Sequence, residues 1–396
     1  MARILIVWEL GGGLGHALPL RALADQLQQR GHEVIVAARD LLKLQRAFVG
    51  NACTLMSAPF FPGLQLPPQQ MNALSDVLWF ESGGHSTETV RAQFRAWRGM
   101  VKLLRPDLIV TDAAPMVLAA TQGLVPQLNY DGYFHATDAC AWSMFRDWER
   151  ADTAATAERA ARLLDHLNVA RAEVGLAMAE HLPSAFAAAT QLLRCLPELD
   201  PFGPRIGARC IGHQTSAGIA PEWPEAANAR RVFVYLRSGY AHAERLLGAL
   251  VRQQGLAVLC VVDSSDAVTW PQAAHVRYCD QPVDLNIALS QAGLVICHGG
   301  ALHGLATQCG KPTLLMPLHT EHYLTSRMGE RLGTSLVVMP PLTSADFLTP
   351  MRRLLAEPSF TRQAEQAAAR HRERGSEPLR VVLAEVDGLL AGQRAA

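Results

Sequence analysis

Two stretches of this sequence combine histidine with glycine in an order that could do chemistry. The first is Gly11-Gly12-Gly13-Leu14-Gly15-His16, and the second is Cys297-His298-Gly299-Gly300-Ala301. An imidazole titrates near neutral pH, so it can take up or release a proton during a reaction. Glycine has no Cβ atom, so a ligand can approach the main chain closely. We therefore treat both stretches as candidate functional sites.

The second stretch is predicted to join a strand to a helix. An apolar run at 294–297 precedes it, and apolar residues at helical spacing follow from 302 to 309. Residues 313–316 are predicted to form the next buried strand. The uncapped N–H groups and the dipole of a helix N-terminus favour an anion. These features predict a diphosphate site at residues 298–300.

The composition excludes several classes of protein. Lys plus Arg and Asp plus Glu each number 36, so no basic field for nucleic acid or a membrane surface is expected. The hydrophobic share of 49% supports large buried cores, and no apolar run is long enough to span a membrane. The N-terminal residues lack a signal-peptide pattern, and the eight cysteines include no CxxC pair. We expect a cytoplasmic protein with reduced cysteines, and the composition leaves a homo-oligomer open.

The order of predicted elements indicates an α/β fold with two Rossmann-like, doubly wound domains. A strand at 3–8, the first glycine loop, a helix and a strand at 34–37 open the first domain. Later strands of that domain are predicted at 108–111, 125–128 and 191–196. A stretch rich in proline and glycine at about 197–225 is predicted to be a linker, after which the alternation restarts. Ligands of such domains bind at the carboxyl ends of the strands, here in a cleft between the two domains.

The second stretch resembles the donor-binding signature of GT-B glycosyltransferases, the class with UDP-glucosyl, glucuronosyl and macrolide glycosyltransferases. The chain keeps His298-Gly299-Gly300, Gly310-Lys311-Pro312, Pro317 and the pair Glu321-His322. It departs from the pattern in three ways. The helix is one residue shorter, Leu302-His303 replaces Gly-Thr, and residues 306–308 provide no counterpart of the glutamate that contacts the donor ribose.

The resemblance implies an organisation and a donor site. Residues 1–205 would bind the acceptor, residues 206–375 would bind a nucleotide sugar, and a helix at 376–396 would cross back to the first domain. Arg237 could offer a bidentate fork to the diphosphate. The donor-binding residues that we expect are Gly13, Arg237, Ser238, Pro282, Val283, His298, Gly299, Gly300, Ala301, Glu321 and His322.

The first stretch continues as Gly15-His16-Ala17-Leu18-Pro19, which is similar to the Gly-His-x-x-Pro of macrolide-type glycosyltransferases. There the histidine is the general base toward the acceptor or lies beside it. A carboxylate on the other ring nitrogen would fix the tautomer. Asp112 is the candidate because it ends the predicted strand 106–112, on the edge where ligands bind. His16 as a helix N-terminal residue and Asp112 as a helix N-cap remain the structural alternatives.

Other functions are open at this point. Gly11-x-Gly13-x-x-His16 nearly matches the dinucleotide fingerprint, and Arg39 could suit an NADP 2′-phosphate, which would indicate an oxidoreductase. A nucleotide-sugar-binding protein without transferase activity and a sugar-nucleotide epimerase are further alternatives. His319 and His322 with Glu321 could also be interpreted as metal ligands.

The function that we expect is glycosyl transfer. The donor would be a nucleoside-diphosphate sugar, with UDP or dTDP as the nucleotide, and the acceptor a small or lipid-like molecule. By analogy, a single displacement with His16 as base would invert the anomeric carbon. We expect no metal and no cofactor other than this co-substrate, because a helix N-terminus and basic side chains can neutralise the departing diphosphate.

Overall fold

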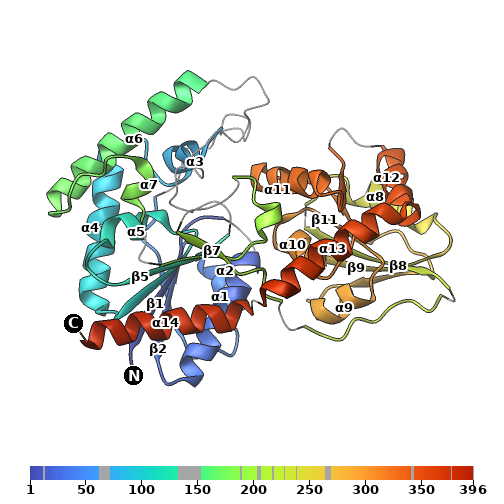
Figure 1. Ribbon diagram of the computed structural model, residues 1–396, viewed down its shortest axis with the longest axis horizontal. Helices are drawn as coiled ribbons and strands as arrows, with labels where there is room; N and C mark the ends of the chain where they lie inside the picture. The colour runs from blue at the N-terminus through green and yellow to red at the C-terminus, as the bar shows by residue number, and fades with distance from the viewer. Residues whose placement is uncertain are drawn as a thin grey trace. The chain divides into compact units, whose positions relative to one another are not determined.

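The computed structural model describes residues 1–11, 14–61, 72–132, 153–187, 190–202, 207–215, 218–226, 228–237, 239–263, 269–339, 343–375 and 377–395. These residues belong to two compact units (Figure 1). Unit 1 comprises Met1–Arg194, Phe202–Ile211 and Glu377–Ala396, and unit 2 comprises Cys195–Pro201 and Gly212–Ser376.

Unit 1 is built on a parallel sheet of seven strands in the order β3-β2-β1-β4-β5-β6-β7. Its strands are β1 (Arg3–Trp8), β2 (Glu33–Ala38), β3 (Thr54–Ser57), β4 (Leu108–Asp112), β5 (Gln127–Asp131), β6 (Thr190–Leu193) and β7 (Ala208–Cys210). Its helices are α1 (Leu14–Gln29), α2 (Leu41–Ala47), α3 (Leu74–Glu81), α4 (Thr87–Leu104), α5 (Pro115–Thr121), α6 (Thr153–Glu173), α7 (Leu182–Ala185) and α14 (Pro378–Ala395). Successive strands are added toward one edge from β1 to β3 and toward the other edge from β4 onward, which makes β1 and β4 the topological switch point.

Helices cover both faces of this sheet. Right-handed crossovers place α1 and α2 on one face and α3, α4 and α5 on the other. The last helix, α14, packs against α1 and against strands β4 and β5 (Figure 1). Its side chains Val382 and Val386 are fully buried in the core of unit 1. A segment from the end of the sequence therefore completes the first hydrophobic core.

Unit 2 is built on a parallel sheet of six strands in the order β10-β9-β8-β11-β12-β13. Its strands are β8 (Arg230–Arg237), β9 (Leu256–Asp263), β10 (Val276–Cys279), β11 (Leu294–Cys297), β12 (Thr313–Leu315) and β13 (Ser335–Val337). Its helices are η3 (a 3₁₀ helix, Pro197–Leu199), α8 (Ala243–Val251), α9 (Leu285–Gln291), α10 (Gly300–Gln308), α11 (Thr320–Arg331), α12 (Ser344–Ala356) and α13 (Pro358–Arg374). Its switch point lies between β8 and β11.

Each face of the second sheet has a hydrophobic core of its own. Along β8, Val232, Val234 and Leu236 pack with residues of α8 and α12, whereas Phe233 packs with residues of α9 and α10. This alternation follows from the two-residue period of a strand. Because both faces are covered, the strands consist largely of apolar residues, as is typical of parallel sheets.

The two parallel sheets confirm the predicted α/β class and the doubly wound topology. Strand ends were predicted less well. The strand expected at 125–128 begins at Gln127 and continues to Asp131, because Asn129 and Asp131 interrupt the apolar run on which the prediction relied. The strand expected at 191–196 ends at Leu193. The stretch expected to be a linker contains β7 and η3.

Two further features concern the described residues. Every cysteine there is free of a disulfide bond. No helix among these residues has the length and apolarity needed to cross a lipid bilayer.

The packing of α14 leads to a stability prediction. Val386→Asp places a carboxylate in the core of unit 1 and should lower the free energy of unfolding by about 3 kcal/mol or more. Ala384→Asp, two residues earlier on the exposed side of the same helix, should change it by no more than about 0.5 kcal/mol. Chemical denaturation of the two variants would measure both effects. Equal stability of the two variants would show that α14 does not contribute to the core.

Candidate active site

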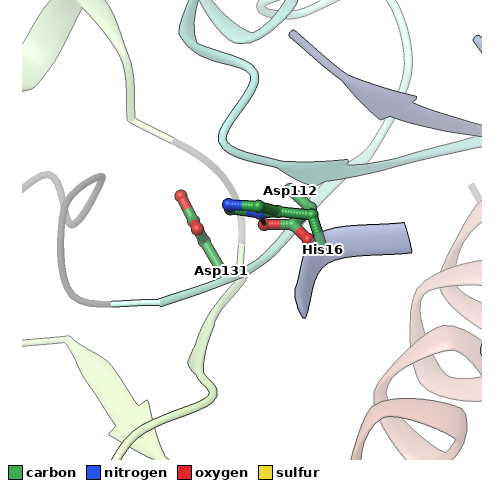
Figure 2. A group of neighbouring side chains, drawn as sticks. All are labelled: His16, Asp112 and Asp131. Carbon is green, nitrogen blue, oxygen red and sulfur yellow. Dashed lines mark hydrogen bonds and ion pairs between the residues drawn. The ribbon is translucent and has the colours of Figure 1, made fainter. Parts of the chain in front are cut away.

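Four adjacent strands of unit 1 bring polar side chains to one edge of the sheet. In a parallel sheet all carboxyl ends lie at the same edge, and β1, β4, β5 and β6 are consecutive neighbours there. His16 lies in the first turn of the helix that follows β1. Asp112 and Asp131 end β4 and β5, and Arg194 directly follows β6. Figure 2 shows that His16, Asp112 and Asp131 converge.

His16 and Asp112 form a hydrogen-bonded pair, as the sequence predicted for a base and its orienting carboxylate. The distance from His16 Nδ1 to Asp112 Oδ1 is 3.0 Å. The Asp112 side chain is fully buried, whereas that of His16 is 26% exposed. Since an ionised carboxylate only accepts hydrogen bonds, Nδ1 donates and Nε2 carries the lone pair. Trp8 stacks on the ring at a centroid distance of 5.5 Å and an interplanar angle of 17°.

The second oxygen of Asp112 is bound by Arg194, which the sequence analysis did not identify. Arg194 Nη2 donates to Asp112 Oδ2, and the guanidinium group is almost completely buried. Arg194 Nη1 also donates to the main-chain oxygen of Gly15, over 3.4 Å. The guanidinium carbon lies 4.8 Å from the centre of the Tyr130 ring. Arg194 therefore connects the carboxylate to the loop in front of His16.

Asp131 adds a second carboxylate, which the sequence analysis also missed. It is 2% exposed, and its Oδ1 accepts a hydrogen bond from the main-chain N–H of Gly132 at 2.5 Å. Groups of His16, Asp112 and Asp131 that could bind a metal lie within 4.8 Å of one another. Both oxygens of Asp112 are already bound, one by His16 and one by the Arg194 cation. A metal ion bound to Asp112 would therefore have to displace one of these partners.

The surroundings of His16 act on its pKa in opposite directions. Burial lowers the pKa, while the charge and the hydrogen bond of Asp112 raise it. The Arg194 cation lowers it and the Asp131 carboxylate raises it, and the net effect is a pKa above the usual value. The raised pKa makes neutral His16 a stronger base and stabilises the imidazolium formed when it takes up a proton.

The backbone around Asp112 is held in place by a buried glutamate. The main-chain N–H groups of Met116 and Val117, in the first turn of α5, donate to Glu9 at 2.7 and 2.9 Å. Ala113 has a φ of 48°, a left-handed conformation that is costly for a residue with a side chain. Its carbonyl oxygen accepts a hydrogen bond from Leu10 at 2.8 Å. Contacts from the β1 end therefore support this strained turn beside Asp112.

The predicted donor turn lies at the switch point of unit 2. Gly299 and Gly300 have φ values of 115° and 61°, and α10 begins there without a side-chain cap. The first turn of α11 packs against the same glycines, since a Cβ on Gly299 or Gly300 would lie 3.2 or 3.1 Å from atoms of His322. The N–H groups of the turn are the kind of site that binds an anion.

His298 braces this turn through both ring nitrogens. Its Nδ1 lies 2.9 Å from the main-chain oxygen of Met316, and its Nε2 accepts a hydrogen bond from the main-chain N–H of Arg237 at 3.1 Å. The residue is 2% exposed, and burial lowers its pKa to about 4. His298 is therefore neutral at pH 7 and joins the ends of β8, β11 and β12.

His322 is also kept neutral. Burial lowers its pKa well below the usual value, and the nearby His319, His298 and Arg237 lower it further. Within the described part of the chain, its Nδ1 has no hydrogen-bond partner. Glu321 precedes it in the first turn of α11. His322 thus lies next to the glycine turn as a neutral imidazole.

The other predicted donor residues occupy different environments. Ala301 is exposed in the first turn of α10. Val283 is 3% exposed and packs in a core of unit 2. The carbonyl oxygen of Pro282 accepts a hydrogen bond from Ile219 at 3.0 Å, so it is engaged by the chain segment that precedes β8. Gly13 and Ser238 lie outside the described residues.

Comparison with known proteins identifies the fold. No protein-family model and no curated protein sequence matches the chain. Among solved structures, it is similar to the spinosyn rhamnosyltransferase SpnG complexed with thymidine diphosphate, with a TM-score of 0.68, 22% identity and coverage of 96% of this chain and 99% of that one. It is also similar to the glycosyltransferase VinC in complex with dTDP, with a TM-score of 0.68, 19% identity and coverage of 98% of this chain and 99% of that one. The glycosyltransferase SnogD from Streptomyces nogalater has a TM-score of 0.64 and 19% identity, with coverage of 98% of this chain and 99% of that one.

The chain has the GT-B fold. The predicted resemblance is thereby confirmed for the architecture of both units, which the alignments cover almost completely. His303, which departs from the GT-B donor pattern, is fully buried and lies 3.2 Å from the Ser335 hydroxyl through its Nε2. This substitution therefore belongs to the core of unit 2 and not to the surface of the glycine turn.

Gly11 should be essential for the placement of His16. A Cβ at this position would lie 2.6 Å from His16 Nε2, whereas a Cβ at Gly31 would have no neighbour within 4 Å. Both residues have a positive φ, so Gly11→Ala and Gly31→Ala should each cost about 1 kcal/mol of stability. Only Gly11→Ala should shift the imidazole resonances of His16 in an NMR spectrum. Identical spectra for both variants would contradict the close approach.

The buried His303 should make unit 2 sensitive to acid. Burial lowers its pKa in the folded protein to about 3, against 6.5 in a model peptide. The unfolded chain binds a proton between these values and the folded chain does not, so stability falls as the pH drops through this window. In His303→Gln the loss of unfolding free energy between pH 7 and about pH 4.5 should be smaller by about 2–3 kcal/mol.

Denaturant unfolding at each pH would measure this difference. From about pH 7 to pH 8, where His303 is neutral in both states, wild type and variant should change alike. An equal loss of stability in acid would show that His303 is protonated in the folded protein.

Proposed function

We propose that the protein is an inverting glycosyltransferase. It would move a sugar from a nucleoside diphosphate to a hydroxyl group of a small-molecule or lipid-like acceptor. The observation that carries this proposal is the His16–Asp112 pair at the switch point of unit 1, in a chain with the GT-B fold. In this proposal unit 1 binds the acceptor and unit 2 binds the donor.

His16 would act as the general base. An acceptor hydroxyl is a weak nucleophile, and removal of its proton during attack contributes about 10²–10⁴-fold in rate. The acceptor oxygen forms a bond to the anomeric carbon while the bond from that carbon to the diphosphate oxygen breaks. The hydroxyl proton passes to His16 Nε2, and the electron pair of the broken bond leaves with the nucleoside diphosphate. A single displacement of this kind inverts the anomeric carbon.

Asp112 would orient His16 and stabilise the imidazolium. Its hydrogen bond to Nδ1 favours the tautomer in which Nε2 can accept a proton. Because the carboxylate is buried, its charge acts on the ring with little screening by water. The same charge raises the pKa of His16, which supports proton uptake in the transition state.

The donor diphosphate would bind at the glycine turn of unit 2. The N-terminus of α10 presents main-chain N–H groups, and Arg237 ends the neighbouring strand β8. Since His298 and His322 have lowered pKa values, positive charge would come from the helix dipole and Arg237. Such a site can neutralise the leaving group without a metal. We favour dTDP as the nucleotide, because SpnG was solved with thymidine diphosphate and VinC with dTDP, and UDP remains the alternative that the sequence resemblance implies.

A nucleotide-sugar-binding protein that transfers nothing is the second candidate. The chain has no glutamate at residues 306–308, where GT-B relatives are expected to contact the donor ribose. The Gln308 side chain bonds both the N–H and the oxygen of His213, at 2.6 and 3.1 Å, so it is engaged elsewhere. An oxidoreductase is disfavoured because His16, at the third position of the dinucleotide fingerprint, is paired with Asp112.

Donor binding and transfer should respond differently to removal of His16. Calorimetry with dTDP, UDP and NADPH should detect binding of a pyrimidine diphosphate by the wild type. His16→Ala should keep this affinity within a few-fold and should lose transfer by roughly 10²-fold or more. Asp112→Asn should also lose transfer, because the wrong tautomer would face the acceptor.

The control is a variant of unit 1 whose substitution lies away from the site. An exposed substitution in unit 1 such as Asp387→Asn should leave both binding and transfer unchanged. Equal loss of affinity and turnover in His16→Ala would make His16 a binding contact. A wild-type protein that binds sugar nucleotides but releases no sugar to any acceptor or to water would support the second candidate, and one that binds only NADPH would support an oxidoreductase.

A further inference from the structure

The base in unit 1 is surrounded by more charged groups than an orienting carboxylate requires. Arg194 is almost completely buried, and its cation binds the oxygen of Asp112 that His16 does not use. Its main-chain N–H donates to the main-chain oxygen of Asp131 at 2.6 Å. Figure 2 shows the tip of the His16 ring directed toward the Asp131 carboxylate. The imidazole thus lies between two carboxylates, one of which is held by a cation.

The remaining titratable groups in this region are engaged elsewhere. Within the described part of unit 1, both carboxylate oxygens of Glu9 accept hydrogen bonds from main-chain N–H groups of α5. Tyr130 lies beneath the guanidinium group, and burial raises its pKa to about 12, so it stays neutral. Asp112, Asp131 and Arg194 therefore provide the charges that face His16, with one more negative than positive charge among them. A proton on His16 makes the cluster neutral.

We propose that Asp131 and Arg194 are positioning residues that set the proton affinity of His16 in opposite directions. Arg194 holds the Asp112 carboxylate in place and offsets its charge, which keeps the imidazole from retaining its proton too strongly. Asp131 presents a second negative charge to the ring and favours the protonated form. This inference rests on the proposed role of His16 as a base and extends it to two residues that do not need to touch the substrate.

A direct titration of His16 tests this inference without any substrate. The full chain would be labelled with ¹³C-histidine and followed by NMR from about pH 5 to pH 9, a range that brackets the usual imidazole pKa. The His16 signal is identified by its loss in His16→Gln. Asp131→Asn should lower the pKa of His16, and Arg194→Gln should raise it, each by about one unit.

Two further variants separate charge from structure. Arg194→Lys keeps the cation and should leave the pKa of His16 close to the wild-type value. Arg30→Gln removes an exposed cation that pairs with Asp387. Arg30 directly follows α1, at the opposite end of that helix from His16, so this variant should leave the pKa of His16 unchanged. If Arg194→Gln does not fold, Asp131→Asn and Arg194→Lys still carry the test.

Several outcomes would overturn the inference. An unchanged pKa of His16 in both Asp131→Asn and Arg194→Gln would remove both residues from this role. A lowered pKa in Arg194→Gln would mean that Arg194 serves only to hold Asp112 against the ring. Selective broadening of the His16 signal by added Mn²⁺ would show that the cluster is a metal site.

The pH dependence of transfer gives a second readout. The acid limb of the pH–rate profile should move to lower pH in Asp131→Asn and to higher pH in Arg194→Gln, in parallel with the NMR titration. A protein that transfers no sugar but shows the NMR shifts would refute the proposed function and keep this inference. A transferase whose His16 titration is unaffected would refute this inference alone.

Discussion

The buried carboxylate of Asp112 is the constraint on which the first site depends. A charge that is removed from water must be paired and hydrogen-bonded, or its burial is costly. Asp112 meets this requirement by giving one oxygen to His16 and the other to Arg194. The residues come from the ends of three strands that are near neighbours in the sheet, so the order of the strands determines which side chains can meet. Loss of either partner would leave the carboxylate incompletely paired.

The pKa shifts at the second site run in the opposite direction to that of His16. Its histidines are buried beside one another and near Arg237, and their pKa values are lowered instead of raised. A neutral His298 can donate through one nitrogen and accept through the other, which allows it to join main-chain groups of two strand ends. Positive potential at the glycine turn then comes from the start of α10. Under the proposed function, the second site would bind an anion and the first site would accept a proton.

The sequence predicted those features that depend on local order. Alternating strands and helices indicated two parallel sheets, and histidine with glycine after a strand indicated the two sites. Asp112 could be predicted because it follows an unbroken apolar strand. Asp131 could not, because polar residues within β5 obscured the end of that strand. Arg194 could not, because the apolar residues that follow it extended the predicted strand to 196 and placed Arg194 in its interior. The contacts of His298 were also beyond prediction, since Met316 and Arg237 lie 18 and 61 positions away in the sequence.

Both sites use glycine to make room for an imidazole. In unit 1, Gly11 approaches His16 so closely that an added Cβ would lie 2.6 Å from Nε2. In unit 2, an added Cβ at Gly299 or Gly300 would crowd His322 at 3.2 or 3.1 Å. The glycines of both motifs therefore have a steric role inside the protein besides any approach of a ligand. A glycine-rich turn beside a histidine is then a sign of a ring packed onto the backbone, and this packing fixes the direction in which its nitrogen atoms point.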